Sequence, residues 1–77
     1  MHFVKDVQYL SDFKLLITFE DDVKKKVDLA PYLDGDVFEP LKDIDFFKRV
    51  KINKDIDTIV WENDADFSPD FLYTISV

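Results

Sequence analysis

The chain has 77 residues, no cysteine and a single glycine, and its 17 acidic against 10 basic side chains give it a formal charge of −7. A chain without cysteine has no disulfide framework and no thiolate metal site, and a strongly acidic chain repels the phosphate backbone of nucleic acids at long range. No segment reaches the roughly 20 apolar residues of a membrane span, and the first residues lack the pattern of a signal peptide. We therefore expect one cytoplasmic domain over residues 1–77 that contacts neither nucleic acid nor membrane directly.

Large apolar side chains dominate the composition. A chain of this length buries only about 60–65% of the surface that its unfolded form exposes. Hydrophobic residues make up 47% of the chain and aromatic residues 16%, with eight phenylalanines, and aromatic rings bury more area per residue than small aliphatic side chains do. The composition predicts a folded domain rather than a disordered segment.

The N-terminal part of the chain shows the alternation that is typical of β-strands. Residues 3–10 and 14–20 are predicted strands joined by a short turn. In the second strand, Leu15, Ile17 and Phe19 occupy alternate positions, so these three side chains are expected in the core.

A third strand is expected after a tight turn. An Asp-Asp step that ends at Asp22 stands where the turn should be, and aspartate tolerates the left-handed backbone of such turns, although less readily than glycine does. Residues 23–29 then place Val23, Val27 and Leu29 on one face. The three strands are predicted to form an antiparallel meander.

The middle of the chain combines a loop, a short helix and a second hairpin. Two prolines and the single glycine predict a loop over residues 30–42 that holds one short helical turn. Asp43 or Asp45 can cap the brief helix that follows by accepting hydrogen bonds from free backbone N–H groups. A hairpin around Asp55 brings the expected number of strands to about five. Its opposed positions would be Val50 and Ile52 against Ile59 and Trp61.

The closing stretch TIVWENDADFSPDFLY, at residues 58–73, contains the signals of a helix start. Ser68 is a favourable N-cap, and Pro69 suits the first helical position because its missing N–H would be unbonded there. Phe67 before the cap and Leu72 four residues after it have the spacing of a hydrophobic staple. The expected fold class is therefore α+β: an antiparallel-rich sheet, a three-strand meander plus a second hairpin, with one short mid-chain helix and a short C-terminal helix.

Few residues suit catalysis. Without cysteine, and with only His2 as a histidine, a nucleophile–base pair of the usual kind is nearly excluded. His2 is expected to be a solvated imidazole at a frayed terminus. A single glycine also excludes a glycine-rich phosphate loop. We expect no enzyme activity, no catalytic residue and no cofactor.

The acidic residues of the closing stretch raise the question of a metal or acid–base site. Asp64 and Asp66 begin a spacing of two that is similar to the first half of a calcium loop. Counting from Asp64, however, Pro69 and Ile75 stand where that loop requires Gly and Glu. The acids are therefore interpreted as turn and cap residues, and a carboxylate-dependent enzyme around residues 62–70 is kept as a remote alternative.

Two other features have a structural and a functional interpretation. Trp61 is expected in the core, and the alternative is a small-molecule sensor with an apolar pocket beside its ring. The lysine-rich segments 23–27 and 48–54 are interpreted as solvated strand faces, where lysine also discourages edge-to-edge pairing of strands.

The order of these motifs resembles a small bacterial family, domain of unknown function 2442. The resemblance covers nearly the whole chain. Its closing motif is carried by Trp61, Asp66, Ser68, Pro69, Leu72 and Tyr73. Its middle positions fall on Asp28, Phe38, Leu41 and Phe47. Family members usually have glycine where this chain has Asp22 and Asp64.

The resemblance implies a compact α+β domain that occurs alone or fused ahead of a helix-turn-helix domain. Short members are similar to proteins encoded beside small toxin-like partners, with an antitoxin role proposed, and no catalytic residue can be carried over from the family. We therefore expect a protein-interaction or regulatory module that pairs with a small basic protein, and a homodimer is kept as the alternative assembly. The six residues of the closing motif are the candidate functional or fold-closing residues.

Overall fold

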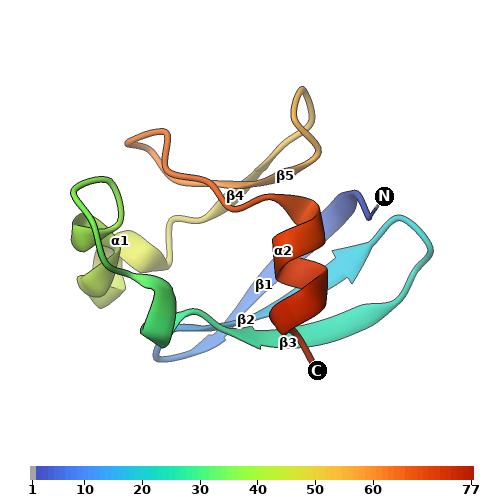
Figure 1. Ribbon diagram of the computed structural model, residues 1–77, viewed down its shortest axis with the longest axis horizontal. Helices are drawn as coiled ribbons and strands as arrows, with labels where there is room; N and C mark the ends of the chain where they lie inside the picture. Colours follow the sequence, from blue (N-terminus) through green and yellow to red (C-terminus); the bar gives the residue numbers. More distant parts are fainter. Residues whose placement is uncertain (1) are drawn as a thin grey trace.

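The computed structural model describes residues 2–77, which form five strands and several short helices (Figure 1). The elements are β1 (Val4–Ser11), β2 (Lys14–Phe19), β3 (Lys24–Asp28), the 3₁₀-helices η1 (Ala30–Tyr32) and η2 (Glu39–Lys42), α1 (Ile44–Phe47), β4 (Lys51–Asn53), β5 (Thr58–Val60) and α2 (Pro69–Ile75). The predicted α+β class, the three-strand meander, the second hairpin and both α-helices are confirmed. The five strands are divided between two antiparallel sheets, β1-β2-β3 and β4-β5.

The register of the three-stranded sheet follows from the alternation in β2. Leu15, Ile17 and Phe19 are buried, as predicted, and pair with the neighbouring strands through positions such as Tyr9 and Val27. Val23 precedes β3 and is 37% exposed. The prediction that Val23 lies in this strand, on the same face as Val27 and Leu29, is therefore wrong.

Aspartate occupies the left-handed backbone positions of the turns. Asp12, Asp22, Asp57 and Asp64 have φ angles of 47°, 66°, 54° and 65°. Asp22 and Asp64 are the two positions at which the resemblance implied glycine, and their φ angles explain why glycine suits them. The only glycine, Gly35, also has a positive φ, of 103°.

The segment between the sheets is built from short helical turns. The predicted loop over residues 30–42 contains η1 and η2, where one turn was expected, and Pro31 and Pro40 lie at their starts. Asp43 caps α1, because its carboxylate accepts a hydrogen bond of 3.1 Å from the backbone N–H of Asp45. Leu41 and Phe47 anchor the segment in the core.

The second hairpin lies over one face of the first sheet, and the core fills the space between them (Figure 1). Ile52 pairs with Ile59, as predicted. The backbone N–H of Val4 donates to the carbonyl of Asp57 in the β4–β5 turn at 2.9 Å, which joins the start of β1 to the hairpin.

Helix α2 crosses the side of this core, and the chain after it returns to the edge of β3 (Figure 1). Val77 and Lys26 exchange two backbone hydrogen bonds, of 2.8 and 2.9 Å. This reciprocal pair is the hydrogen-bonded pair of antiparallel geometry, so Val77 protects part of an otherwise open edge of β3.

Candidate functional site

Trp61, the first residue of the closing motif, is a core residue. Its side chain is 1% exposed, and its ring lies 5.6 Å from that of Phe47 and 6.0 Å from that of Phe67. The indole Nε1–H donates a 2.9 Å hydrogen bond to the backbone carbonyl of Phe47. Since a buried Trp N–H needs such a partner, this bond fixes the end of α1 against the end of β5.

The chain turns directly after Trp61. The backbone N–H of Asp64 donates to the carbonyl of Trp61 at 2.9 Å, and the Asn63 side chain accepts from the N–H of Ala65 at 3.2 Å. The residue with the left-handed backbone is Asp64. Asp66 follows the turn, where it is exposed and forms an isolated antiparallel bridge with Val60.

Ser68, Pro69 and Leu72 start and anchor α2. The Ser68 hydroxyl accepts a 3.1 Å hydrogen bond from the N–H of Phe71, and Pro69 is the first helical residue. Phe67 and Leu72 are both buried in the core. The capping role predicted for Ser68 is confirmed.

Tyr73 connects α2 to the residues before β1 and to β3. The imidazole of His2 stacks on its ring at 3.6 Å between centroids, with an angle of 4° between the planes. The ammonium of Lys25 lies 3.8 Å from the ring centroid, and because the imidazole occupies one face, the ammonium must lie over the other. The prediction that His2 is a solvated terminal residue is wrong, since its backbone N–H also donates to Asp70 at 3.0 Å.

Four aromatic rings on η1, on α2 and in nearby loops pack in a row that runs from the core to the surface. We call them the aromatic row: Tyr32, Phe71, Phe67 and Phe38. Successive centroids are 5.2 Å, 5.8 Å and 4.7 Å apart. The row joins residues 32–38, in η1 and the loop before η2, to residues 67–71, at the start of α2, two segments that are far apart in the sequence.

Negative charge gathers on the segments that carry the aromatic row. Residues 55–77 contain six carboxylates and no lysine or arginine, and residues 30–47 contain five carboxylates and one lysine. The side chain of Asn63 donates a 2.9 Å hydrogen bond to the carbonyl of Val37, so the two segments meet. Five exposed aspartates on these two segments are named the acidic surface: Asp34, Asp36, Asp64, Asp66 and Asp70.

One lysine offsets part of this charge. Lys42 lies 2.6 Å from Glu39 and 3.7 Å from Asp34, and the hydrogen bond to Glu39 raises the pKa of Lys42 above its ordinary value of 10.5. Within residues 2–77, no basic group lies within 4.0 Å of the carboxylates of Asp36, Asp64 or Asp66. These three charges are open to a partner.

A second exposed ion pair with a short contact joins β1 to the β2–β3 turn of the first sheet. Lys5 contacts Asp22 at 2.7 Å. The hydrogen bond between them lowers the pKa of Asp22 below 3.8 and raises the pKa of Lys5 above 10.5. This pair fixes the β2–β3 turn to β1 and is separate from the acidic surface.

The carboxylates of residues 62–70 do not converge. All four are exposed, and in the described part of the chain no three His, Asp or Glu side chains form a group that could hold a metal ion. Residues 2–77 also contain no buried side-chain nitrogen or oxygen atom without a hydrogen-bond partner. The geometry therefore offers these acids to solvent or to a partner.

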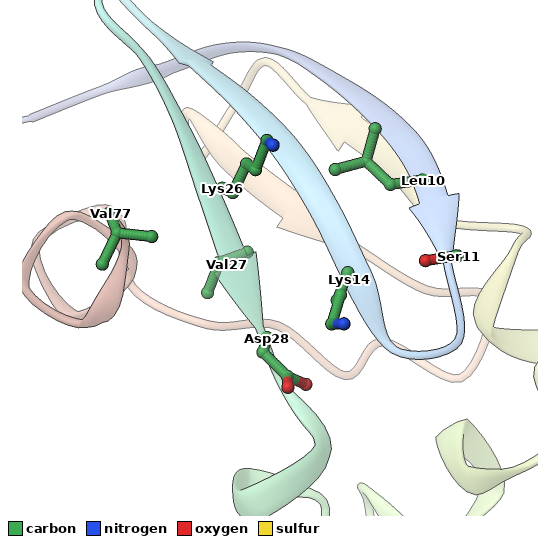
Figure 2. A pocket seen from close by; sticks show the side chains of 7 residues that line it. All are labelled: Leu10, Ser11, Lys14, Lys26, Val27, Asp28 and Val77. Carbon is green, nitrogen blue, oxygen red and sulfur yellow. The ribbon is translucent and has the colours of Figure 1, made fainter.

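A surface hollow of about 520 Å³ lies on the first sheet, away from the β4–β5 hairpin (Figure 2). Its lining residues are Leu10, Ser11, Lys14, Lys26, Val27, Asp28 and Val77. Two further hollows, of about 300 Å³ and 90 Å³, lie near Val4 and near His2. Trp61 lines none of the three.

Comparisons with known proteins identify a family but no characterised relative. Residues 4–77 match the family model described as "Protein of unknown function (DUF2442)", which confirms the resemblance seen in the sequence. No curated protein and no solved structure matches the chain. Among the described residues, none of the helices has the length and apolar character required to span a bilayer.

Proposed function

The chain belongs to the DUF2442 family of proteins of unknown function, and we propose that it is a protein-interaction module that binds a basic protein partner through the acidic surface. The observation that carries the proposal is the uneven distribution of charge. Residues 48–54 contain four basic side chains and no acid, whereas the segments on either side of them are strongly acidic.

This distribution suits electrostatic recognition of a basic protein. Complementary charge speeds the encounter of two proteins and fixes their orientation, more than it adds to affinity. Screening limits such attraction to about 8–10 Å at physiological ionic strength, so a local concentration of carboxylates matters more than the total charge.

The proposal includes a regulatory role in the cytoplasm. The partner would be a small basic protein, toxin-like in the sense that the resemblance implies, and the domain would neutralise it by binding. A chain of net charge −7 has little attraction for nucleic acid or for an anionic membrane surface, so both are left out of the proposal.

Two alternatives are less well supported. A small-molecule sensor would have to use a surface hollow such as that of Figure 2, because the ring of Trp61 is enclosed by its neighbours. A carboxylate-dependent enzyme would need acids held in a cleft, and the exposure of the acids in residues 62–70 favours solvated groups. The proposal therefore includes no catalytic step.

The test is a comparison of three tagged proteins in affinity capture from the cytoplasm of the source cell, followed by quantitative mass spectrometry and light scattering. The first is the wild type. The second carries Asp34→Asn, Asp36→Asn, Asp64→Asn and Asp66→Asn. The third carries Asp12→Asn, Glu20→Gln, Asp21→Asn and Asp55→Asn, which remove the same charge elsewhere.

We expect a stoichiometric basic protein with the wild type and the third protein, and its loss with the second. Recovery of the domain alone, as a monomer or homodimer, would contradict the proposal. Equal capture by all three proteins would show that the acidic surface is not the binding site.

A further inference from the structure

The aromatic row is apolar and yet partly open to solvent. Tyr32 is 39% exposed, and Val37, which precedes Phe38 in the sequence, is 49% exposed. Phe38 and Phe71 are half-buried, whereas Phe67 at the centre of the row is only 7% exposed. Contiguous exposed apolar side chains with a polar rim are a feature of protein interaction sites.

The row is also held in place before any partner binds. Phe67 contacts the core residue Trp61, and the side chain of Asn63 holds the backbone of Val37. A surface that is already ordered loses less conformational entropy on binding, which favours affinity.

The charges around the row restrict the chemistry of the partner. The carboxylates of Asp36, Asp64 and Asp66 have no basic group of residues 2–77 within 4.0 Å. Asp36 directly precedes Val37 and Asp66 directly precedes Phe67 in the sequence, so we expect a cationic side chain at the row to find a carboxylate at its border.

Arginine satisfies both contacts better than lysine does. Its planar guanidinium stacks on aromatic rings and binds carboxylates in a bidentate manner, whereas the lysine ammonium acts as a point charge. Within this chain, lysines already cover the rings of Tyr73 and Tyr9, at 3.8 Å and 5.5 Å. No cation of residues 2–77 is found over Tyr32.

We infer that the aromatic row and Val37 form the docking surface for an amphipathic, arginine-rich segment of the partner, whose apolar side chains cover the row and whose guanidinium groups reach the acidic surface. The inference rests on the proposed function and identifies the surface and the partner chemistry that it would use.

The test uses three short synthetic peptides of equal length as probes. One alternates Arg-Leu pairs, one replaces each Leu by Ser, and one replaces each Arg by Glu. Binding is measured by calorimetry and by NMR shifts of the aromatic side chains. The protein variants are Tyr32→Ala and Val37→Ser, with Ile56→Ser as the matched control, because Ile56 is 46% exposed and lies in the β4–β5 turn.

We expect the Arg-Leu peptide to bind and to shift the resonances of Tyr32, Phe38 and Phe71. Each test variant should weaken its binding about tenfold, which corresponds to about 1.4 kcal/mol, and Ile56→Ser should leave it unchanged. The Glu-Leu peptide should not bind.

Two outcomes would overturn the inference in different ways. If the Arg-Ser peptide binds as tightly as the Arg-Leu peptide, charge alone is recognised; the docking surface is then wrong while the proposed function survives. If no cationic peptide shows saturable binding that weakens with salt, the inference and its basis in the proposed function both fail.

Discussion

At the scale of single residues, the four aspartates with positive φ show how the chain makes tight turns with so little glycine. A left-handed backbone costs a residue other than glycine roughly 1–2 kcal/mol, and less for aspartate and asparagine. Asp64 and Asp22 therefore store a small amount of backbone strain at the tips of their turns.

Asp64→Gly should raise the free energy of unfolding by up to about 0.5 kcal/mol, because glycine adopts φ angles near 65° without strain and the relief of strain slightly exceeds its extra entropy in the unfolded chain. Urea denaturation of the purified domain measures the change. Asp22→Gly is the comparison, and its gain should be smaller because it also removes the ion pair with Lys5. A loss of stability in Asp64→Gly would show that the Asp64 side chain has a role beyond the turn.

At the scale of elements, local sequence patterns predicted the features that are set by residues close together in the chain, such as the buried face of a strand and the start of a helix. The alternation at Leu15, Ile17 and Phe19 gave the core face of β2, and the Ser68-Pro69 step gave the start of α2. The hydrogen bond from Trp61 to Phe47 and the stack of His2 on Tyr73 join residues distant in the sequence. Such contacts depend on tertiary packing and leave no local signature, which explains why His2 was misplaced.

The junction of β5 and α1 depends on Trp61. Trp61→Ala should lower the free energy of unfolding by about 3–5 kcal/mol, the range for truncation of a large buried aromatic residue. Thermal melts measure this loss. For comparison, Trp61→Phe keeps an aromatic ring but removes one of the two donors to the Phe47 carbonyl, which keeps the N–H of Val50 at 3.3 Å, so the lost hydrogen bond should cost about 0.5–1.5 kcal/mol. An unchanged melting temperature for Trp61→Ala would contradict its place in the core.

The start of α2 depends on the Ser68 cap. Ser68→Ala should cost about 1 kcal/mol, because the N–H of Phe71 loses its acceptor. Chemical denaturation gives the value, and Ser68→Asp is the control, since aspartate also caps and should restore most of the stability. Equal stability of Ser68→Ala and the wild type would mean that the hydroxyl contributes nothing to the helix start.

At the scale of the whole molecule, the sequence predicted the components of the fold but not their grouping. Five strands were expected in one sheet, and the structure divides them between two sheets that are joined where the start of β1 meets the β4–β5 turn, through Val4 and Asp57. The candidate site shows the same limit. Five residues of the closing motif have structural roles in the turn, in the helix cap or in the core and its edge. Only Asp66 belongs to the acidic surface. That surface forms when residues 30–47 fold against residues 61–71.

The central claim is that a basic partner binds through the acidic surface, and the salt dependence of that binding tests it most directly. The measurement is isothermal titration calorimetry of the purified partner, over a series of NaCl concentrations, with the wild type and with the variant Asp34→Asn, Asp36→Asn, Asp64→Asn, Asp66→Asn. The account predicts that the affinity of the wild type falls steeply with salt and that the affinity of the variant is lower and varies less. An affinity that is the same at low and high salt, and the same in both proteins, would contradict it.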